Sequence, residues 1–181
     1  MSASDIHFET ERLILRPPQA EDFAGWAAFF ADPEATRHMG GVRSESLAWR
    51  HFLMMAGAWS IQGFGAFSLV EKSSGRWLGW SGPWHPPGWP GTEIGWCLAR
   101  DAWGHGYATE SAVAIVDWAF QYLGWDDVVH LITPDNHASM VVARKLGSTC
   151  GRRIDMPEPF AGEPVDVWRQ TRKQWLQRRP A

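Results

Sequence analysis

The segment best suited to chemistry is a glycine-rich run, Gly104–Ala108, which reads Gly-His-Gly-Tyr-Ala. It lies between a stretch of alternating residues, 92–98, and a long run with helical spacing. Glycines allow the backbone to bend closely around a ligand, and the N–H groups at a helix start form a partly positive concavity. The segment therefore favours a phosphate or pyrophosphate ligand. The alternative is a tight turn that only begins a helix.

Other well-known catalytic motifs do not fit the sequence. A Walker loop needs a lysine after its second glycine, where this chain has Ala108 and Thr109. A dinucleotide-binding turn needs a third glycine, and Thr109 stands in its place. No Cys-x-x-Cys or His-Glu-x-x-His pattern occurs, so we expect no metal site. In Gly79–Pro83 the second glycine comes one residue too early for a hydrolase elbow, and a serine nucleophile is not expected.

Periodic segments predict the elements that position the glycine-rich run. In 92–98, Glu93, Gly95 and Cys97 share one face, as expected for a strand. Apolar residues at helical spacing predict helices, and short aliphatic or alternating runs predict strands. The expected helices are 23–30, 44–62, 108–123 and 136–146, and the expected strands are 12–16, 66–71, 76–80, 92–98, 127–133, 148–155 and 164–171. The predicted fold class is α/β (or α+β) with a mixed sheet.

Two further segments have a distinctive composition. Residues 83–91 hold four prolines and two glycines, so we expect a loop. From Trp168 onward the chain carries five basic residues, Arg179 among them, and no acids. We interpret this tail as a solvated basic face.

Size and charge place limits on the protein's class. With 181 residues, the chain suits a single domain, 1–181, with a core of about 8–175. The formal net charge of −3 argues against a nucleic-acid partner. Leu53–Val70 lacks charges, as a membrane span does. It contains a glycine break, so we interpret it as the end of a helix followed by a strand, and we expect no membrane partner. No export signal is visible, and Cys97 and Cys150 are expected to be free thiols, which favours a cytoplasmic location.

Four motifs in order resemble the GNAT superfamily of N-acetyltransferases, and more specifically its ribosomal-protein-alanine (RimJ/RimL-type) branch. They are Thr10–Arg16 (Thr-Glu-Arg-Leu-Ile-Leu-Arg), Trp103–Glu110 (Trp-Gly-His-Gly-Tyr-Ala-Thr-Glu) after Glu93, Asn136–Ser139 (Asn-His-Ala-Ser), and Lys145–Gly147 (Lys-Leu-Gly). The resemblance extends from about Phe8 to Trp175.

The resemblance implies a GNAT-like three-layer fold, whose mixed, mostly antiparallel central sheet is splayed around acetyl-CoA. It also implies which residues bind this cosubstrate. Leu98 would offer backbone groups to the pantetheine arm, the loop N–H groups would hold the pyrophosphate, Asn136 would face the arm, and Lys145 would approach the terminal phosphates. The implied cofactor-binding set is Leu98, Gly104, His105, Gly106, Tyr107, Ala108, Thr109, Asn136 and Lys145.

Acetyl transfer to an amine needs a general base, because a lysine-like amine has a pKa of about 10.4 and attacks only when unprotonated. On the strand implied to carry the cofactor, Glu93 is the candidate, acting directly or through water. A surface or hairpin carboxylate is the alternative interpretation. Many relatives are thought to use a tyrosine as acid where this chain has Ala143. This leaves Ser139 as the nearest candidate, although Asn136 and Ser139 also read as ordinary helix-start residues.

Two histidines and one further departure complete the sequence interpretation. His85, in the 83–91 loop, is a second candidate base, and His130 is expected to be a hydrogen-bonded core residue. Ser148 stands where relatives commonly carry phenylalanine, a departure from the branch pattern.

The function expected from the resemblance is direct acetyl transfer from acetyl-CoA to a primary amine, in a ternary complex. The acceptor would be a protein N-terminus or a small-molecule amine. The alternative is a non-catalytic CoA-binding or sensing module of the same fold. Tryptophans that lie exposed would favour a homodimer.

Overall fold

The computed structural model describes residues 6–158 and 160–178. Contacts divide the chain into two compact units, each built from separate segments. The first consists of the chain up to Gly82 together with Trp96–Ser111, and the second of Pro83–Gly95 together with the chain from Ala112 onward. Two elements therefore contribute residues to both units, namely β5 (Glu93–Leu98) and α3 (Tyr107–Trp118).

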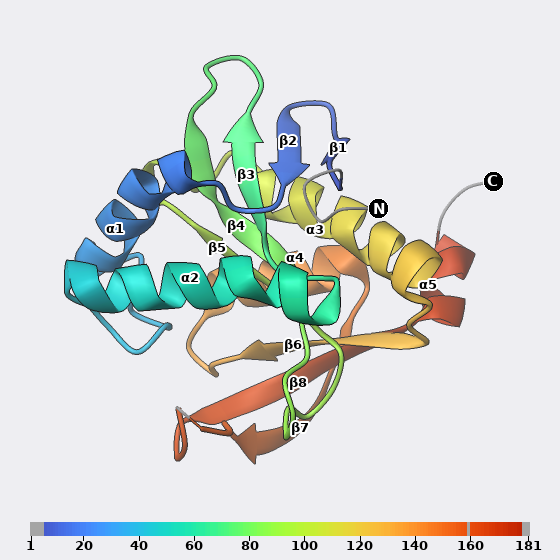
Figure 1. Ribbon diagram of the computed structural model, residues 1–181. Coiled ribbons are helices and arrows are strands. Elements are labelled where there is room, and N and C mark those ends of the chain that lie inside the picture. Colours follow the sequence, from blue (N-terminus) through green and yellow to red (C-terminus); the bar gives the residue numbers. More distant parts are fainter. Residues whose placement is uncertain (1–5, 159, 179–181) are drawn as a thin grey trace. The chain divides into compact units, whose positions relative to one another are not determined.

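The first unit contains an antiparallel run of strands (Figure 1). Its strands follow the order β1 (Phe8–Glu9), β2 (Leu13–Arg16), β3 (Phe67–Glu71) and β4 (Trp77–Trp84), whose last two residues belong to the second unit. Its helices are α1 (Phe23–Ala31) and α2 (Glu45–Gln62), with short 3₁₀ turns at Ala20–Asp22 and Arg100–Ala102. The N–H of Ala99 donates to the carbonyl oxygen of Leu78 at 2.9 Å, so the end of β5 lies beside β4.

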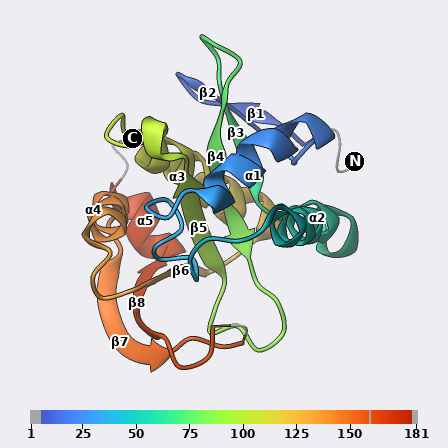
Figure 2. The same ribbon diagram turned by 90° about the vertical axis from the view of Figure 1, so that its left-hand side faces the viewer.

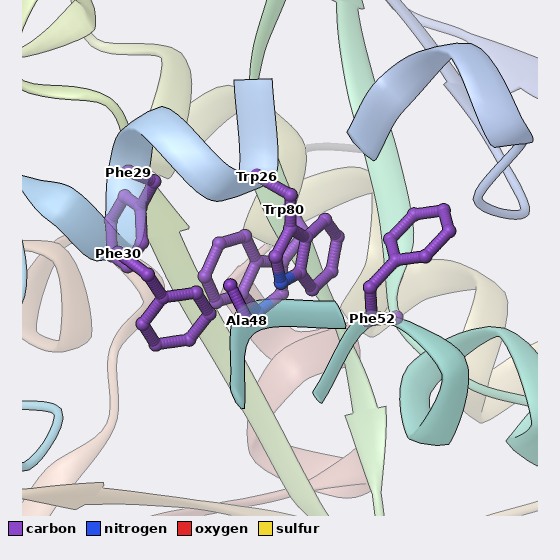
Figure 3. Packing of buried hydrophobic residues seen from close by; sticks show 7 residues of the cluster. Trp26, Phe29, Phe30, Ala48, Phe52 and Trp80 are labelled. Carbon is purple, nitrogen blue, oxygen red and sulfur yellow. The ribbon is translucent and has the colours of Figure 1, made fainter. Parts of the chain in front are cut away.

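Aromatic side chains form the core of the first unit (Figure 3). The rings of Trp26 in α1 and Trp80 in β4 stack with centroids 4.1 Å apart. Phe29 packs edge-on against Trp80 at 4.6 Å. Phe52 and Ala48 bring α2 into the same cluster. Burial of such large apolar surfaces is the main force that holds the two helices against the strands.

The second unit contains β6 (Asp127–Ile132), β8 (Pro164–Thr171) and β7 (Thr149–Asp155), with antiparallel pairing of β6 to β8 and of β8 to β7. In contrast, the first half of β5 pairs with β6 in parallel. Figure 2 shows β7 and β8 side by side, with α4 (His137–Leu146) and α5 (Arg172–Arg178) nearby. The chain thus has a mixed, mostly antiparallel α/β architecture, as the sequence predicts.

Most expected elements are confirmed within one to three residues. The long helix from Tyr107 continues as a π-helical turn, Ala119–Leu123, and ends at Gly124 with φ 67°. The helix before Gly147 ends in the same left-handed conformation, with φ 87°. Glycine adopts this conformation without the steric cost that a side chain would add. No helix in the described part of the chain has the length and apolar character needed to cross a membrane.

One expected strand has the wrong end, and two further elements were not expected. The strand expected at 76–80 extends through Trp84, so Pro83 and Trp84 belong to β4 and not to the following loop. A two-residue strand, β1, lacked any sequence signal. Within the basic tail, residues 172–178 form α5. Its basic residues are exposed, as a solvated basic face requires, while Trp175 is buried and donates from its indole to Asp117 at 2.6 Å. Arg179, at the end of the expected basic face, lies outside the described residues.

Candidate active site

The glycine-rich run forms a sharp turn immediately before α3. Gly104 and Gly106 have φ of 78° and 84°, a backbone conformation that favours glycine. The first hydrogen bond that enters α3 runs from the N–H of Glu110 to the carbonyl oxygen of Gly106, at 3.0 Å. The N–H groups of Tyr107, Ala108 and Thr109 therefore have no acceptor within the helix. This turn fits a diphosphate, because orphan N–H groups and the helix dipole both favour an anion there.

Arg12, which precedes β2, lies against this turn. Its Nη1 donates to the carbonyl oxygen of His105 at 2.9 Å, and its guanidinium carbon lies 4.5 Å from the centre of the Tyr107 ring. Because the carbonyl of His105 points toward Arg12, the direction of the peptide groups on either side of it in the turn is also fixed. The arginine thus holds the turn from one side while the orphan N–H groups remain available.

Glu110, in the first turn of α3, completes this attachment. Its Oε1 accepts from the Thr10 hydroxyl at 2.5 Å and from the N–H of Arg12 at 2.9 Å, and its Oε2 accepts from Nε of Arg12 at 2.7 Å. Burial alone raises the pKa of Glu110, but these hydrogen bonds and the arginine charge bring the pKa below its usual value. We name Thr10, Arg12 and Glu110 the loop clamp.

The end of β5 is attached to the same turn through Trp103. The indole Nε1 of Trp103 donates to the carbonyl oxygen of Leu98 at 2.9 Å. Because the N–H of Ala99 points toward β4, backbone alternation turns the N–H of Leu98 to the opposite edge of the strand. This N–H is the group that Leu98 can offer to a ligand. β4 approaches closely at Gly79, where a Cβ would come within 2.2 Å of the carbonyl oxygen of Cys97.

In the second unit, Glu93 lies where the parallel ladder between β5 and β6 stops. The N–H of Val129 donates to the carbonyl oxygen of Thr92 at 3.0 Å, and Glu93 pairs with Val129 in register. The next backbone hydrogen bond of a regular parallel ladder would run from the N–H of Leu131 to the carbonyl oxygen of Ile94. Instead, the N–H of Leu131 donates to Glu93 Oε1 at 3.3 Å. A side chain thus replaces the backbone at the point where the two strands stop pairing.

The side chain of His130 bonds to the carbonyl of Ile94, the backbone acceptor that a regular ladder would join to the N–H of Leu131. Its Nδ1 lies 2.6 Å from the carbonyl oxygen of Ile94, and its Nε2 lies 3.0 Å from the hydroxyl of Ser148. Since a carbonyl only accepts, Nδ1 carries the proton and the Ser148 hydroxyl donates to Nε2. Burial lowers the pKa of His130 to about 4, so the ring is neutral. The prediction of a hydrogen-bonded core histidine is confirmed, and Ser148 has a structural partner.

Glu93 has the properties of a base that works near neutral pH. Burial raises its pKa to about 7, although hydrogen bonds from Trp89 and Leu131 oppose this shift. Its carboxylate lies along its own strand, with Oε1 3.9 Å from the position that a Cβ on Gly95 would take. The predicted shared face of Glu93 and Gly95 is thus confirmed. A carboxylate with such a pKa exchanges protons efficiently at physiological pH.

The residues predicted at the start and end of α4 have local structural partners. Asn136 caps the helix, since its Oδ1 accepts from the N–H of Ser139 at 3.1 Å. Lys145 is exposed, and its carbonyl oxygen accepts from Arg178 at 3.1 Å. Ala143 is fully buried and has no group able to donate a proton. In the 83–91 loop, the ring Nδ1 of His85 bonds to the carbonyl oxygen of Gly91 at 2.9 Å, which closes the loop.

The structure therefore gathers the predicted site residues in two groups. Leu98 and the glycine-rich turn belong to the first unit, while Glu93, Asn136, Ser139 and Lys145 belong to the second. Sequence reasoning missed the loop clamp residues as contacts of the turn and missed Trp89 as a contact of Glu93. The only sequence signal for the clamp is that Thr10, Arg12 and Glu110 all belong to the four motifs.

Comparison with known proteins gives consistent matches. Residues 12–149 match the model of the acetyltransferase (GNAT) domain. The FsC-acetyl coenzyme A-N(2)-transacetylase of Aspergillus fumigatus is 30% identical over 185 residues, which cover 92% of this chain and 77% of that protein. An acetyltransferase structure from Agrobacterium tumefaciens is 33% identical with a TM-score of 0.82 and covers 92% and 95% of the two chains. The ribosomal-protein-S5-alanine acetyltransferase of Vibrio fischeri, 18% identical with a TM-score of 0.71 over 97% and 100%, is similar in fold.

Proposed function

The chain belongs to the GNAT family of acetyltransferases, and on this basis we propose that it transfers the acetyl group of acetyl-CoA directly to a primary amine. The observation that carries the proposal is the turn before α3. Its glycines adopt left-handed backbone conformations, and the N–H groups of Tyr107, Ala108 and Thr109 have no helical acceptor. These groups would hold the pyrophosphate of CoA, with His105 contributing its backbone.

Other chain groups would orient the rest of the cosubstrate. The N–H of Leu98 would bond to the pantetheine arm, and the Asn136 amide nitrogen remains available for the same arm because only its oxygen caps α4. Lys145, exposed in the last turn of α4, would approach the terminal phosphates. Bound acetyl-CoA supplies a thioester carbonyl that an amine can attack.

Glu93 would take the proton from the attacking amine, directly or through one water. The N–C bond forms as the C–S bond breaks, the amine proton moves to Glu93, and CoA leaves as a thiolate. A thiol of pKa about 8.5 leaves without strong acid assistance, so the absence of a tyrosine at Ala143 is compatible with turnover. Ser139, at the start of α4, is our candidate for returning a proton to the thiolate.

The acceptor class follows from this chemistry. The nucleophile is a neutral amine nitrogen, which gains positive charge as it attacks the thioester carbonyl, and a base of pKa about 7 can accept the proton that the nitrogen then loses. A protein N-terminus and a small-molecule amine both meet this requirement. The Aspergillus relative, whose name describes acetyl transfer to an N(2) nitrogen, supports an amine acceptor.

The test is thiol release from acetyl-CoA in the presence of a panel of amines and N-terminal peptides. We expect at least one amine to raise the release rate well above hydrolysis and to yield an acetylated product by mass spectrometry. Calorimetry with CoA provides the second measurement. If CoA binds while no amine raises thiol release, the non-catalytic CoA-binding or sensing module is the better description. If CoA does not bind, both functions are excluded.

We also propose a homodimer formed through α2. Its outer face exposes Leu47, Leu53, Met54 and Ile61, the last of which is 89% exposed. Together they present on the order of 400 Å² of exposed apolar surface, and surface patches of this size are often functional. Sedimentation velocity should show a dimer that Ile61→Lys dissociates, while Val141→Lys on α4 leaves it intact. A monomer at all concentrations would refute this proposal.

A further inference from the structure

One hydrogen bond in the second unit links the proline-rich loop to the candidate base. The indole Nε1 of Trp89 donates to Glu93 Oε2 at 2.6 Å. The backbone N–H of Leu131 donates to the other oxygen, Oε1, at 3.3 Å. Both oxygens of the carboxylate therefore have a donor, one from the loop and one from β6.

The loop that carries Trp89 is itself held in place. The N–H of Trp89 donates to the carbonyl oxygen of Pro86 at 3.1 Å, and His85 bonds to the carbonyl oxygen of Gly91 at 2.9 Å. Gly91 also lies against β6, where a Cβ on it would meet both methyl groups of Val129 at 3.1 Å. Trp89 thus extends from a closed loop and not from a free segment.

We propose that Trp89 is the positioning residue for Glu93, holding the carboxylate in one orientation while leaving it able to accept a proton. Each carboxylate oxygen has about two lone-pair sites. The bonds from Trp89 and Leu131 occupy one site on each oxygen, so further sites remain for an amine or a water. This inference rests on the proposed function, in which Glu93 is the base.

The chemistry of the indole explains why tryptophan suits this position. An indole donates a single hydrogen bond and carries no charge, so it orients a carboxylate without forming an ion pair. An arginine or lysine would instead stabilise the ionised form strongly and make the carboxylate a poorer base. Trp89 is half-buried, so its ring also shields the carboxylate from water.

Few other charges act on Glu93. On the same face of the neighbouring strands β6 and β8 lie Asp127 and Arg169, which pair with each other. His130 also lies on β6, but its side chain is neutral and bonded to Ile94 and Ser148. The neutral donors Trp89 and Leu131 are therefore the groups that set the orientation of the carboxylate.

The test compares Trp89→Phe with two controls. Trp84→Phe makes the same substitution at the end of β4, just before the loop, and Glu93→Gln removes the carboxylate. Isotope-edited infrared spectra recorded against pH follow the Glu93 carboxyl directly, with Glu93→Gln used for assignment. Because Trp89→Phe removes a hydrogen bond to the charged carboxylate, we expect it to move the Glu93 titration upward by about one pH unit. Trp84→Phe should leave it in place.

Kinetics then test the positioning role itself. At each pH, kcat/KM of Trp89→Phe is divided by kcat/KM of the unchanged enzyme. The titration of the amine affects both values equally and so drops out of this ratio. With the Glu93 pKa moving from about 7 to about 8, this ratio should rise about fivefold between pH 7 and pH 9, to a plateau below one that measures the lost orientation. A ratio that stays the same from pH 7 to pH 9 would show that Trp89 does not act through the titrating Glu93 carboxylate and would overturn the inference.

The two proposals fail in different ways. If the infrared titration of Glu93 does not move in Trp89→Phe, while circular dichroism shows a folded protein, the positioning role is wrong whatever the enzyme does. If it moves but the protein acetylates no amine at all, the hydrogen bond stands and the proposed function fails. If it moves and turnover at pH 7 is unchanged, Glu93 is not the base, and Trp89 has no positioning role in catalysis.

Discussion

The guanidinium of Arg12 and the carboxylate of Glu110, which lie 98 positions apart in the sequence, form an ion pair with an N–O distance of 2.6 Å. The pair joins the residue before β2 to the first turn of α3. From the same guanidinium, Nη1 holds the carbonyl of His105. The Thr10–Arg16 and Trp103–Glu110 motifs are therefore held together in the folded first unit.

The first prediction concerns this clamp. Arg12→Gln should weaken CoA binding about tenfold, because the His105 carbonyl and Glu110 lose a charge-assisted donor and the turn no longer has a fixed shape. Calorimetry with CoA measures the effect. Arg37→Gln is the matched control, since Arg37 forms an exposed pair with Glu34 at 3.9 Å in the same unit and should leave binding unchanged. Equal affinities for the two variants would contradict the role of the clamp.

The second prediction concerns the base. Glu93→Gln should lower kcat/KM at pH 7 by about 10²-fold, since general-base catalysis contributes a factor of this order. Activity should recover partly as pH rises, because a larger fraction of the amine is then deprotonated without help. A pH–rate profile of both proteins checks this. A profile of unchanged shape in Glu93→Gln would remove Glu93 from the base role.

The third prediction concerns the effect of the same residue on stability. The folded pKa of Glu93, about 7, lies above the ordinary value of 4.5, so the folded state binds more protons than the unfolded state between these values. Its contribution to stability is therefore present below pH 4.5 and lost as pH rises through 7. Urea unfolding should show Glu93→Gln to be more stable than the unchanged protein by about 3 kcal/mol at pH 8, with little difference at pH 4. Glu163→Gln, an exposed change in the same unit, should show no such trend.

Much of the fold could be predicted because its signals are local. Helices at 23–31 and 137–146 follow apolar spacing, and Gly124 and Gly147 end their helices in a conformation that glycine favours. The strand that carries Glu93 follows simple alternation. The two-residue strand β1 is too short for any periodic signal. The extension of β4 through Pro83 depends on strand pairing, which composition does not reveal.

The candidate site was harder to predict because its contacts are long-range or irregular. The turn at Gly104 and Gly106 has a sequence signature, but its attachment to Arg12 depends on the folded chain. The bond from Trp89 to Glu93 spans only four residues, yet it needs a loop whose course follows no periodic rule. The pairing of His130 with Ser148 could not be predicted either, although the unusual serine at 148 marked the position.

The fourth prediction concerns His130 and the dependence of stability on pH. The folded pKa of His130, about 4, lies below the ordinary value of 6.5, so the unfolded state binds more protons between these values. Its contribution is fully present above pH 6.5 and is lost as pH falls toward 4, by about 3 kcal/mol for this buried group. Glu93 acts in the opposite direction over an overlapping range, so the effect must be measured as a difference between variants.

His130→Gln is the informative variant, because an amide can still donate to the Ile94 carbonyl and accept from Ser148 but does not titrate. Its loss of unfolding free energy between pH 7 and pH 4 should be smaller than that of the unchanged protein by about 3 kcal/mol. His137→Gln, at the exposed start of α4, should follow the unchanged protein. If His130→Gln and His137→Gln lose stability in parallel, His130 does not enter the folded core as a neutral ring.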